Sequence, residues 1–291
     1  MQINNLSLKI NNGWQLTPLV EETMLKQTLI FLITFIIVAL VSMYLLQRQF
    51  IYFPARLMPI RQFFAANDMA EIYLKTEDRL KLLSWYKPAE PGMPTIIYYH
   101  GNAGHIGYRM PFIRYFLNEG YGVLLVEYRG YGGNEGKINE RGLYLDGQAA
   151  IKFLLEQGIL LSKIILYGES LGTGVATKIG SQYKVCAVIL QSPYTSLSAL
   201  AKVHYPWLPI PVRDKFDSLK RIQEVTSPIL ILHGLQDNIV PYAQGLELYK
   251  KANEPKEFID FEKRGHNDLW NMQFFGIINK FIHKHCLFRA S

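Results

Sequence analysis

The stretch KIILYGESLGTGVA, residues 163–176, places a serine between two glycines, after an apolar run and before a run compatible with a helix. The β-branched apolar half is typical of a buried parallel strand, and the small residues that follow let a helix approach a sheet closely. Gly168, Ser170 and Gly172 form a Gly-x-Ser-x-Gly pattern, which permits a sharp strand-to-helix turn with the serine hydroxyl exposed. We interpret Ser170 as a candidate nucleophile, against the alternative of a structural glycine-rich turn.

Beyond this stretch, strand-like and helix-like segments alternate, which predicts an α/β fold with a mostly parallel, eight-stranded sheet. The strand candidates are 71–75, 80–86, 95–99, 122–128, 163–167, 186–191, 228–233 and 257–261. The helix candidates are 110–118, 143–157, 172–183, 244–252 and a last helix that begins near residue 269.

A serine hydroxyl needs a base within hydrogen-bond reach and a third group that orients the base. Asp237 follows the strand candidate 228–233, and His266 lies five residues beyond the strand candidate 257–261. Because parallel strands end at one edge of the sheet, we expect Ser170, His266 and Asp237 to meet there. The competing acids are Asp217, Asp260 and Asp268, and the competing histidines are His100, His105, His204, His233, His283 and His285.

Acyl transfer also needs hydrogen-bond donors aimed at the developing oxyanion. The segment HGNAG, residues 100–104, follows the strand candidate 95–99. We expect the backbone N–H groups of Asn102 and Leu171 to form the oxyanion hole. The alternative for HGNAG is a tight glycine turn.

Residues 192–226 separate two strand candidates by more than a crossover helix needs. The middle of this insertion, HYPWLPIPVR, has three prolines that stiffen the backbone beside aromatic and aliphatic groups. We interpret the insertion as a lid in which Tyr205, Trp207 and Leu208 line an apolar acyl-binding pocket. A surface loop with its own packing is the alternative.

Near the N-terminus, residues 28–46 are nearly all apolar and span about 28 Å as a helix, close to the hydrocarbon thickness of a bilayer. The predicted organisation is a polar segment 1–26, a transmembrane helix 27–47 and a soluble domain 48–291. A buried core helix and a cleaved signal peptide are the alternatives. Met24 is an alternative start of the chain.

The orientation of the predicted membrane helix is weakly encoded. Arg48, Arg56 and Arg61 follow it, whereas Lys9 and Lys26 precede it, so the positive-inside rule favours a cytoplasmic soluble domain. The net charge of +7 is compatible with contact to anionic lipid head groups or with a diffuse solvated surface.

The composition, with 49% hydrophobic residues in 291, permits a large core without cross-links. Cys186 and Cys286 are the two cysteines, and we expect neither a disulfide framework nor a metal site from them. No dinucleotide or phosphate-binding loop is present, so no cofactor is expected. No basic repeat with interleaved aromatic residues points to nucleic acid.

Seven motifs in order resemble the single-pass membrane branch of the α/β-hydrolase-domain proteins, a group that includes lysophospholipases and protein depalmitoylases. They are HGNAGHIGYR, LLVEYRGYGGNEG, NERGLYLDGQAA, YGESLGTGVA, SPYTSL, ILHGLQDNIVP and GHNDLW. The resemblance covers residues 53–291 and implies the same site: nucleophile Ser170, acid Asp237, base His266 and an oxyanion hole at Asn102 and Leu171. Two positions depart from the group's pattern: Glu127, where Asp is usual, and Asn134, where Ser is usual.

These observations favour a membrane-anchored serine hydrolase that cleaves carboxylic ester or thioester bonds of lipid-like acyl substrates through an acyl-enzyme intermediate. A serine peptidase on the same fold is one alternative. A catalytically inactive, membrane-tethered binding protein is the other. The oligomeric state is not indicated by the sequence.

Overall fold

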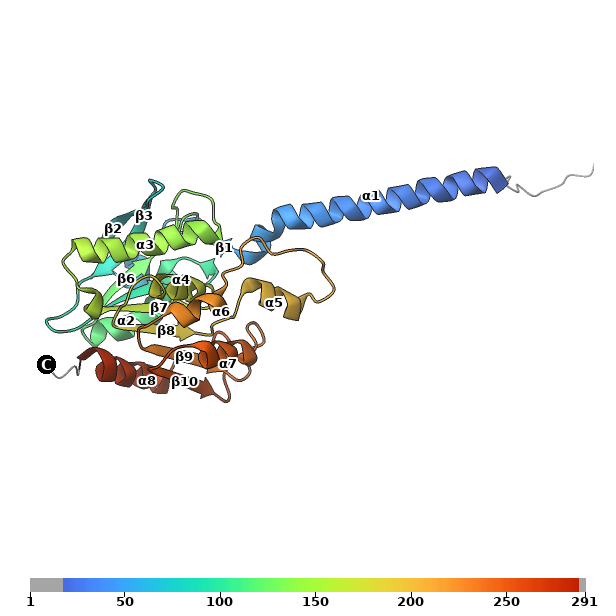
Figure 1. Ribbon diagram of the computed structural model, residues 1–291. Helices are drawn as coiled ribbons and strands as arrows, with labels where there is room; N and C mark the ends of the chain where they lie inside the picture. Colours follow the sequence, from blue (N-terminus) through green and yellow to red (C-terminus); the bar gives the residue numbers. More distant parts are fainter. Residues whose placement is uncertain (1–17, 288–291) are drawn as a thin grey trace, which may run out of the picture. The chain divides into compact units, whose positions relative to one another are not determined.

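The structure is a computed structural model that describes residues 18–287 (Figure 1). The chain divides into two compact units between Leu45 and Leu46. Helix α1 (Pro18–Ile51) begins in the first unit and ends in the second. It extends beyond the predicted range 27–47 at both ends, so residues 18–26 of the polar segment 1–26 are helical; residues 1–17 of that segment lie outside the described residues.

By length and composition, residues Glu22–Ile51 of α1 could cross a membrane. Within this helix, the side chains of Phe31 and Phe35 are 73% and 62% exposed. An exposed apolar helix of this kind near an N-terminus is compatible with a single-pass anchor or with a signal sequence.

The second unit is built on one eight-stranded sheet, which confirms the predicted class and strand count. Its strands are parallel except that β3 runs antiparallel to both of its neighbours. Across the sheet the order is β10 (Lys256–Phe261), β9 (Ile229–Gly234), β8 (Ala187–Gln191), β7 (Ile164–Glu169), β4 (Thr95–Tyr99), β6 (Gly122–Val126), β3 (Lys81–Lys87) and β2 (Ala70–Lys75).

Helices cover both faces of the sheet, because alternate strand side chains point to opposite sides. On β4, Ile97 and Tyr99 belong to one core cluster, whereas Ile96 and Tyr98 belong to the other. The first cluster is closed by α3 (Glu140–Glu156), α4 (Leu171–Gly180) and α7 (Tyr242–Lys251). The second is closed by α2 (Met110–Asn118) and α8 (Met272–Ile282). All five helices match predicted ones, with ends shifted by a few residues.

The insertion 192–226 contains two short helices that the sequence interpretation missed, α5 (Leu197–His204) and α6 (Ser218–Arg221). Each has a side-chain cap, since Ser196 accepts a hydrogen bond from the Ala199 N–H and Asp217 accepts one from the Lys220 N–H. A two-stranded sheet, β1 (Phe53–Pro54) with β5 (Ala103–Gly104), was also not predicted. The remaining short turns are η1 (Arg61–Phe64), η2 (Ile106–Arg109), η3 (Leu161–Lys163), η4 (Ile222–Glu224) and the π-helical η5 (His283–Leu287).

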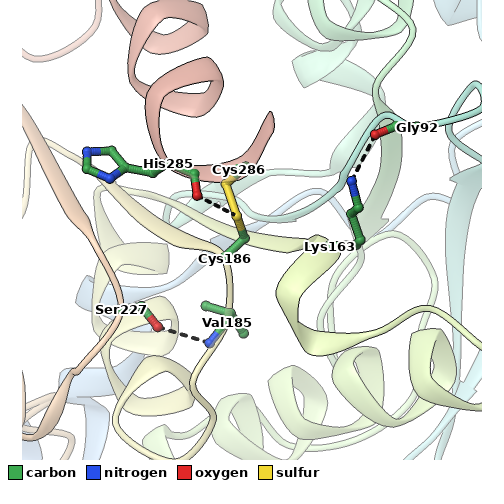
Figure 2. The surroundings of a disulfide bond; sticks show 7 residues. All are labelled: Gly92, Lys163, Val185, Cys186, Ser227, His285 and Cys286. Carbon is green, nitrogen blue, oxygen red and sulfur yellow. Dashed lines mark hydrogen bonds between the residues drawn. A yellow bond between two sulfur atoms is a disulfide. The ribbon is translucent and has the colours of Figure 1, made fainter. Parts of the chain in front are cut away.

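A disulfide joins Cys186, next to β8, to Cys286, after α8 (Figure 2). The expectation that the cysteines do not pair was therefore wrong. Their sequence separation of 100 residues carried no signal, because only the packing of α8 against the sheet brings the two Cα atoms to 5.6 Å. Closing a loop of that length stabilises the folded state by about 4 to 5 kcal/mol in the chain-entropy treatment.

Candidate active site

Ser170 occupies a strained turn between β7 and α4. Its φ of 49° and ψ of −113° lie in a region that non-glycine residues rarely adopt. The two glycines are needed because a Cβ at Gly168 would lie 2.6 Å from the Gly172 carbonyl oxygen, and a Cβ at Gly172 would collide with the Tyr99 carbonyl oxygen. The turn is thereby pressed against the end of β4, and the serine is held partly exposed at the carboxyl edge of the sheet.

The structure brings Ser170, His266 and Asp237 together, as the sequence predicts. The Nε2 atom of His266 lies 2.9 Å from Ser170 Oγ, and its Nδ1 atom lies 2.7 Å from Asp237 Oδ2. Both contacts are within hydrogen-bond distance. The three residues come from loops after β7, β10 and β9, which end at the same edge because these strands are parallel.

Asp237 is held as a carboxylate. Burial by itself would raise its pKa, but hydrogen bonds from His233, His266 and the Val240 N–H outweigh burial and hold the pKa of Asp237 well below its usual range. Its Oδ1 atom accepts from the Ile239 N–H at 3.0 Å and from the Val240 N–H at 2.7 Å. Oδ2 is therefore left to face His266.

His233 is a neighbour of this arrangement that the sequence interpretation did not assign to it. It is fully buried; its Nε2 lies 2.9 Å from the Val240 carbonyl oxygen and 3.4 Å from Asp237 Oδ2. The signal was present in the sequence, since His233 precedes Asp237 by four residues in ILHGLQD. His233 therefore packs the loop that carries Asp237.

The rival acids are occupied elsewhere. Asp217 caps α6, Asp260 accepts a hydrogen bond from the Tyr242 hydroxyl, and Asp268 accepts one from the Gly265 N–H. Among the rival histidines, His204 contacts the backbone: its Nε2 atom lies 2.8 Å from the Ile239 carbonyl oxygen.

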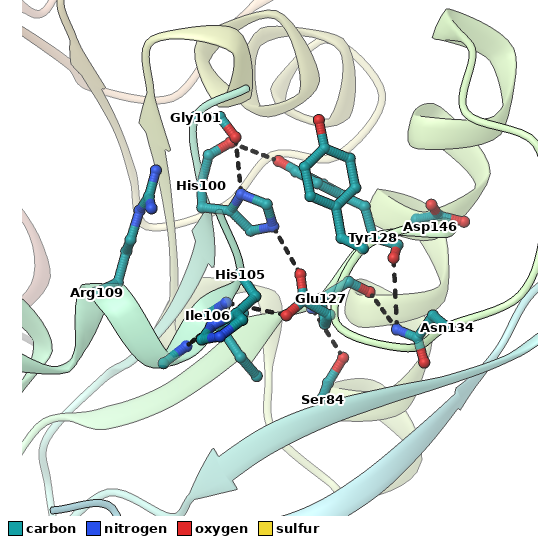
Figure 3. Close-up of polar contacts among 12 residues, drawn as sticks. Ser84, His100, Gly101, His105, Ile106, Arg109, Glu127, Tyr128, Asn134 and Asp146 are labelled. Atoms are coloured by element: carbon teal, nitrogen blue, oxygen red, sulfur yellow. Dashed lines mark hydrogen bonds and ion pairs between the residues drawn. The ribbon is translucent and has the colours of Figure 1, made fainter. Parts of the chain in front are cut away.

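The loop after β4 rests on a buried pair, His100 and Glu127 (Figure 3). His100 Nε2 lies 3.0 Å from Glu127 Oε1, and His100 Nδ1 lies 2.7 Å from the Gly101 carbonyl oxygen. A carbonyl oxygen only accepts, so Nδ1 is the donor in its contact with Gly101. The second carboxylate oxygen of Glu127 accepts from the Ile106 N–H at 2.9 Å. Glu127 thus ties the two ends of the loop together.

The two expected oxyanion donors lie at adjoining segments. Leu171 is the first residue of α4, where N–H groups lack partners within the helix. Asn102 lies in the loop that β4 leads into, and its N–H donates to no other residue in the described part of the chain. The other departure noted in the sequence, Asn134, accepts from the Leu83 N–H at 2.7 Å and so holds the neighbouring loop to β3.

A partly buried ion pair beside the serine was not foreseen. Glu169, the residue before Ser170, forms two contacts with Arg109, at 2.9 and 3.1 Å, and accepts from the Tyr98 hydroxyl at 2.8 Å. Burial would raise the pKa of Glu169, but the Arg109 guanidinium and the Tyr98 hydroxyl lower it overall. The sequence shows both charges but not their pairing, because 60 residues separate them.

The residues expected to line a lid are largely exposed. Tyr205 and Trp207 are 56% and 71% exposed, and Leu208 is partly buried. The insertion nevertheless reaches the site, since His204 at the end of α5 contacts Ile239, and the Ile239 N–H donates to Asp237.

Two surface cavities of the second unit lie away from Ser170. One of about 620 Å³ is lined by Leu155, Leu161 and Val185, and one of about 290 Å³ by Arg48, Glu140 and other residues. The expected acyl pocket is neither of these. Within residues 18–287, no three histidine, cysteine, aspartate or glutamate side chains are grouped so as to hold a metal ion.

Known proteins resemble the chain in sequence. The family model described as serine aminopeptidase, S33, matches residues 92–216. An uncharacterized protein of Mycobacterium tuberculosis is 37% identical over 228 residues, which are 76% of this chain and 81% of that protein. The protein Bem46 of Schizosaccharomyces pombe is 32% identical over 216 residues, which are 69% of this chain and 72% of Bem46.

Solved structures resemble the fold. An esterase of Pyrococcus furiosus superimposes with a TM-score of 0.66 and 21% identity, over 81% of this chain and 98% of the esterase. The acylaminoacyl peptidase of Pyrococcus horikoshii gives a TM-score of 0.61 and 20% identity, over 77% of this chain and 42% of the peptidase. At such identities the likeness establishes the fold alone.

Proposed function

Because the chain belongs to the α/β-hydrolase superfamily, in the branch that includes Bem46, we propose that it is a membrane-anchored serine hydrolase cleaving carboxylic ester or thioester bonds. The observation that carries the proposal is the continuous hydrogen-bonded path from Ser170 Oγ through His266 to Asp237. The backbone at Ser170 supports it, since this conformation turns the chain sharply from β7 into α4 and holds the hydroxyl at the edge of the sheet.

In the proposed reaction, Ser170 Oγ attacks the carbonyl carbon of the substrate while His266 Nε2 takes the hydroxyl proton. His266 then passes this proton to the departing alcohol or thiol, and an acyl ester of Ser170 remains. A water molecule attacks the acyl ester, its proton goes to His266, and the free acid leaves as the proton returns to Ser170. The Asp237 carboxylate orients the ring and stabilises its protonated form.

The N–H groups of Asn102 and Leu171 stabilise the oxyanion of both tetrahedral intermediates. Loss of one such donor commonly lowers kcat about 10² to 10³-fold. The proposal is supported by the position of Leu171 at the first turn of α4 and by the unused N–H of Asn102. The ion pair of Glu169 with Arg109 adds no net charge beside these donors.

We propose a lipid-like acyl group as the substrate, because an apolar helix anchors the enzyme where such molecules partition. The insertion acts as the lid: Tyr205, Trp207 and Leu208 offer apolar surface, and the contact of His204 with Ile239 joins this segment to the Asp237 loop. An aminopeptidase is the second candidate, from the family model and the peptidase neighbour. An aminopeptidase acting on a free amino terminus needs a carboxylate for the substrate ammonium group, whereas Glu169, the carboxylate next to Ser170, is already paired with Arg109.

A substrate panel separates the two candidates. We expect the purified protein to hydrolyse p-nitrophenyl esters from acetyl to palmitoyl, with kcat/KM rising toward longer chains because a longer chain buries more apolar surface against Tyr205, Trp207 and Leu208. Aminoacyl anilides of comparable size are expected to react at least a hundredfold more slowly. A kcat/KM that is higher for the anilides than for every ester would reverse the assignment.

We further propose that the hydrolase unit faces an oxidising compartment. The count of three arginines after the helix against two lysines before it favours the cytoplasmic side only weakly. The Cys186–Cys286 disulfide supports the opposite side, because thiols in reducing compartments are kept reduced. A difference of one basic residue is a weaker indication of orientation than a disulfide.

Thiol labelling in cells that make the full chain tests this orientation. The cells are lysed in denaturant with a maleimide reagent and no reductant. We expect Cys186 and Cys286 to remain unlabelled until a reductant is added, and an external protease to reach the hydrolase unit once any outer envelope is permeabilised. Labelling of both cysteines without reductant, together with protection from the protease, would assign the cytoplasmic side instead.

A further inference from the structure

The segment that ends helix α1 is hydrogen-bonded to the loop that carries Asn102. Strand β1 pairs in parallel with β5, with Phe53 opposite Ala103 and Pro54 opposite Gly104. The Phe53 N–H donates to the Asn102 carbonyl oxygen at 2.9 Å, and the Ala55 N–H donates to the Gly104 carbonyl oxygen at 2.9 Å. Both partners belong to the unit that begins at Leu46.

The side chain of Asn102 completes this connection from the opposite direction. Its Nδ2 donates to the Ile51 carbonyl oxygen at 2.9 Å. Ile51 is the last residue of α1. The carbonyl oxygens of the last turn receive no hydrogen bond from within the helix, so they need a donor from elsewhere. Asn102 therefore caps the end of α1 while its own backbone is held by the residues that follow.

Hydrogen bonds on both sides of Asn102 hold the two peptide groups that this residue joins. The peptide group between Gly101 and Asn102 is planar and trans, so its N–H points away from the Gly101 carbonyl oxygen. That oxygen is held by His100 Nδ1 at 2.7 Å. On the other side of Asn102, its carbonyl oxygen is held by the Phe53 N–H at 2.9 Å and by the Tyr131 hydroxyl at 2.8 Å.

The same segment is also fixed to the insertion. Arg48 contacts both carboxylate oxygens of Asp214, at 2.8 and 2.9 Å, and the Tyr52 hydroxyl donates to Asp214 at 3.0 Å. Asp214 is 3% exposed, so these bonds are sheltered from water and hold the chain firmly. A short run of chain at the end of α1 thus bonds to the insertion on one side and to the loop of Asn102 on the other.

We propose that residues 51–55 are a positioning element of the oxyanion hole, which acts through the side chain and carbonyl of Asn102. The proposal rests on the proposed serine hydrolase function. In this proposal the end of the membrane anchor helps to stabilise the transition state, in addition to attaching the enzyme to the membrane. The prediction concerns kcat, because a misdirected donor affects the oxyanion and not the bound ester.

The test replaces Asn102 with Ala and, separately, with Asp, in the full-length protein purified in detergent. Both variants keep the backbone N–H but lose the donor to Ile51, and Asp also keeps the size of the side chain. We expect kcat for a p-nitrophenyl ester to fall about ten- to a hundredfold, with KM within twofold of the wild type. The Ki of a trifluoromethyl ketone, which forms an oxyanion on Ser170, is expected to rise by the same factor as kcat/KM falls.

Asn253→Ala is the matched control. The Asn253 side chain also donates to backbone carbonyl oxygens, those of Gln223 and Val225 at 2.7 and 2.9 Å, but away from Ser170. Rates are divided by the amount of serine that a fluorophosphonate titrates, so misfolded protein is not counted. The proposal would be overturned if both Asn102 variants had the kcat and Ki of the wild type and a Tm lowered as in Asn253→Ala. That result would show that the Asn102 side chain has a purely structural role. A wild-type protein without esterase activity would instead overturn the proposed function on which it rests.

Discussion

Replacing Ser170 with alanine is expected to abolish ester hydrolysis and covalent labelling by a fluorophosphonate. The Ser170 hydroxyl lies 2.9 Å from His266 Nε2 and is the nucleophile of the proposed reaction. Without this hydroxyl no acyl-enzyme forms. In a comparable serine hydrolase, loss of the nucleophile lowers kcat about 10⁶-fold. We expect a loss of at least about 10⁴-fold here, with an unchanged fold, because alanine is smaller than serine and makes no new contact.

Ser192→Ala is a close control for this experiment. Ser192 follows β8, the strand next to β7, is buried and has a φ of 49°, the same as Ser170. Its backbone N–H donates to the Leu232 carbonyl oxygen, and alanine keeps this bond. We expect Ser192→Ala to keep full labelling and kcat within about threefold. Equal labelling of wild type and Ser170→Ala would refute the assignment of Ser170.

The second large effect is expected for Asp237→Asn. The amide nitrogen of Asn would donate to His266 Nδ1, so the ring proton would be on Nε2. A protonated Nε2 faces Ser170 but cannot accept the proton of its hydroxyl group. In a serine protease this exchange lowers kcat about 10⁴-fold. A loss of about 10³ to 10⁴-fold in kcat with KM little changed is expected, measured by steady-state kinetics with a p-nitrophenyl ester.

Asp268→Asn is the control, because Asp268 is also close to His266 in sequence but bonds to the Gly265 N–H, a contact that Asn keeps. We expect kcat within about fivefold of the wild type. If Asp268→Asn were the slower variant, the acid would be reassigned to Asp268.

The low pKa of Asp237 also predicts how stability depends on pH in these variants. The folded-state pKa lies below the unfolded-state value of about 4, so the carboxylate stabilises the fold above about pH 4, and this contribution is lost as the pH falls further. Asp237→Asn removes that contribution. Its Tm is therefore expected to fall less steeply than that of the wild type below about pH 4, by thermal unfolding in a series of buffers.

Much of the fold was predictable because its signals are local. The eight strands and five main helices were placed within a few residues, since each carries its own apolar pattern. The helices α5 and α6 were not predicted, because the prolines between them indicate a loop for the whole insertion. Their caps, Ser196 and Asp217, are residue types typical of helix starts, and this signal is present in the sequence.

Pairings between distant residues could not be predicted in the same way. Arg109 meets Glu169, His100 meets Glu127, and Cys186 meets Cys286, over separations of 60, 27 and 100 residues. Each partner is an ordinary polar or small residue in its own segment. The order of the strands in the sheet decides which of several possible partners each residue contacts. That order cannot be predicted from the residues of a single segment.

The α/β class, the turn at Ser170 and the identity of the residues beside it could all be predicted from the amino-acid sequence. The reason is that glycine spacing, apolar periodicity and the order of Ser170, Asp237 and His266 are properties of the chain read from one end to the other. The contacts that support the site depend on the folded arrangement of the chain. Asn102 caps α1, Glu127 ties the loop beneath it, and Cys286 reaches Cys186, because these contacts form only once parallel strands have brought distant segments to one edge or one face of the sheet.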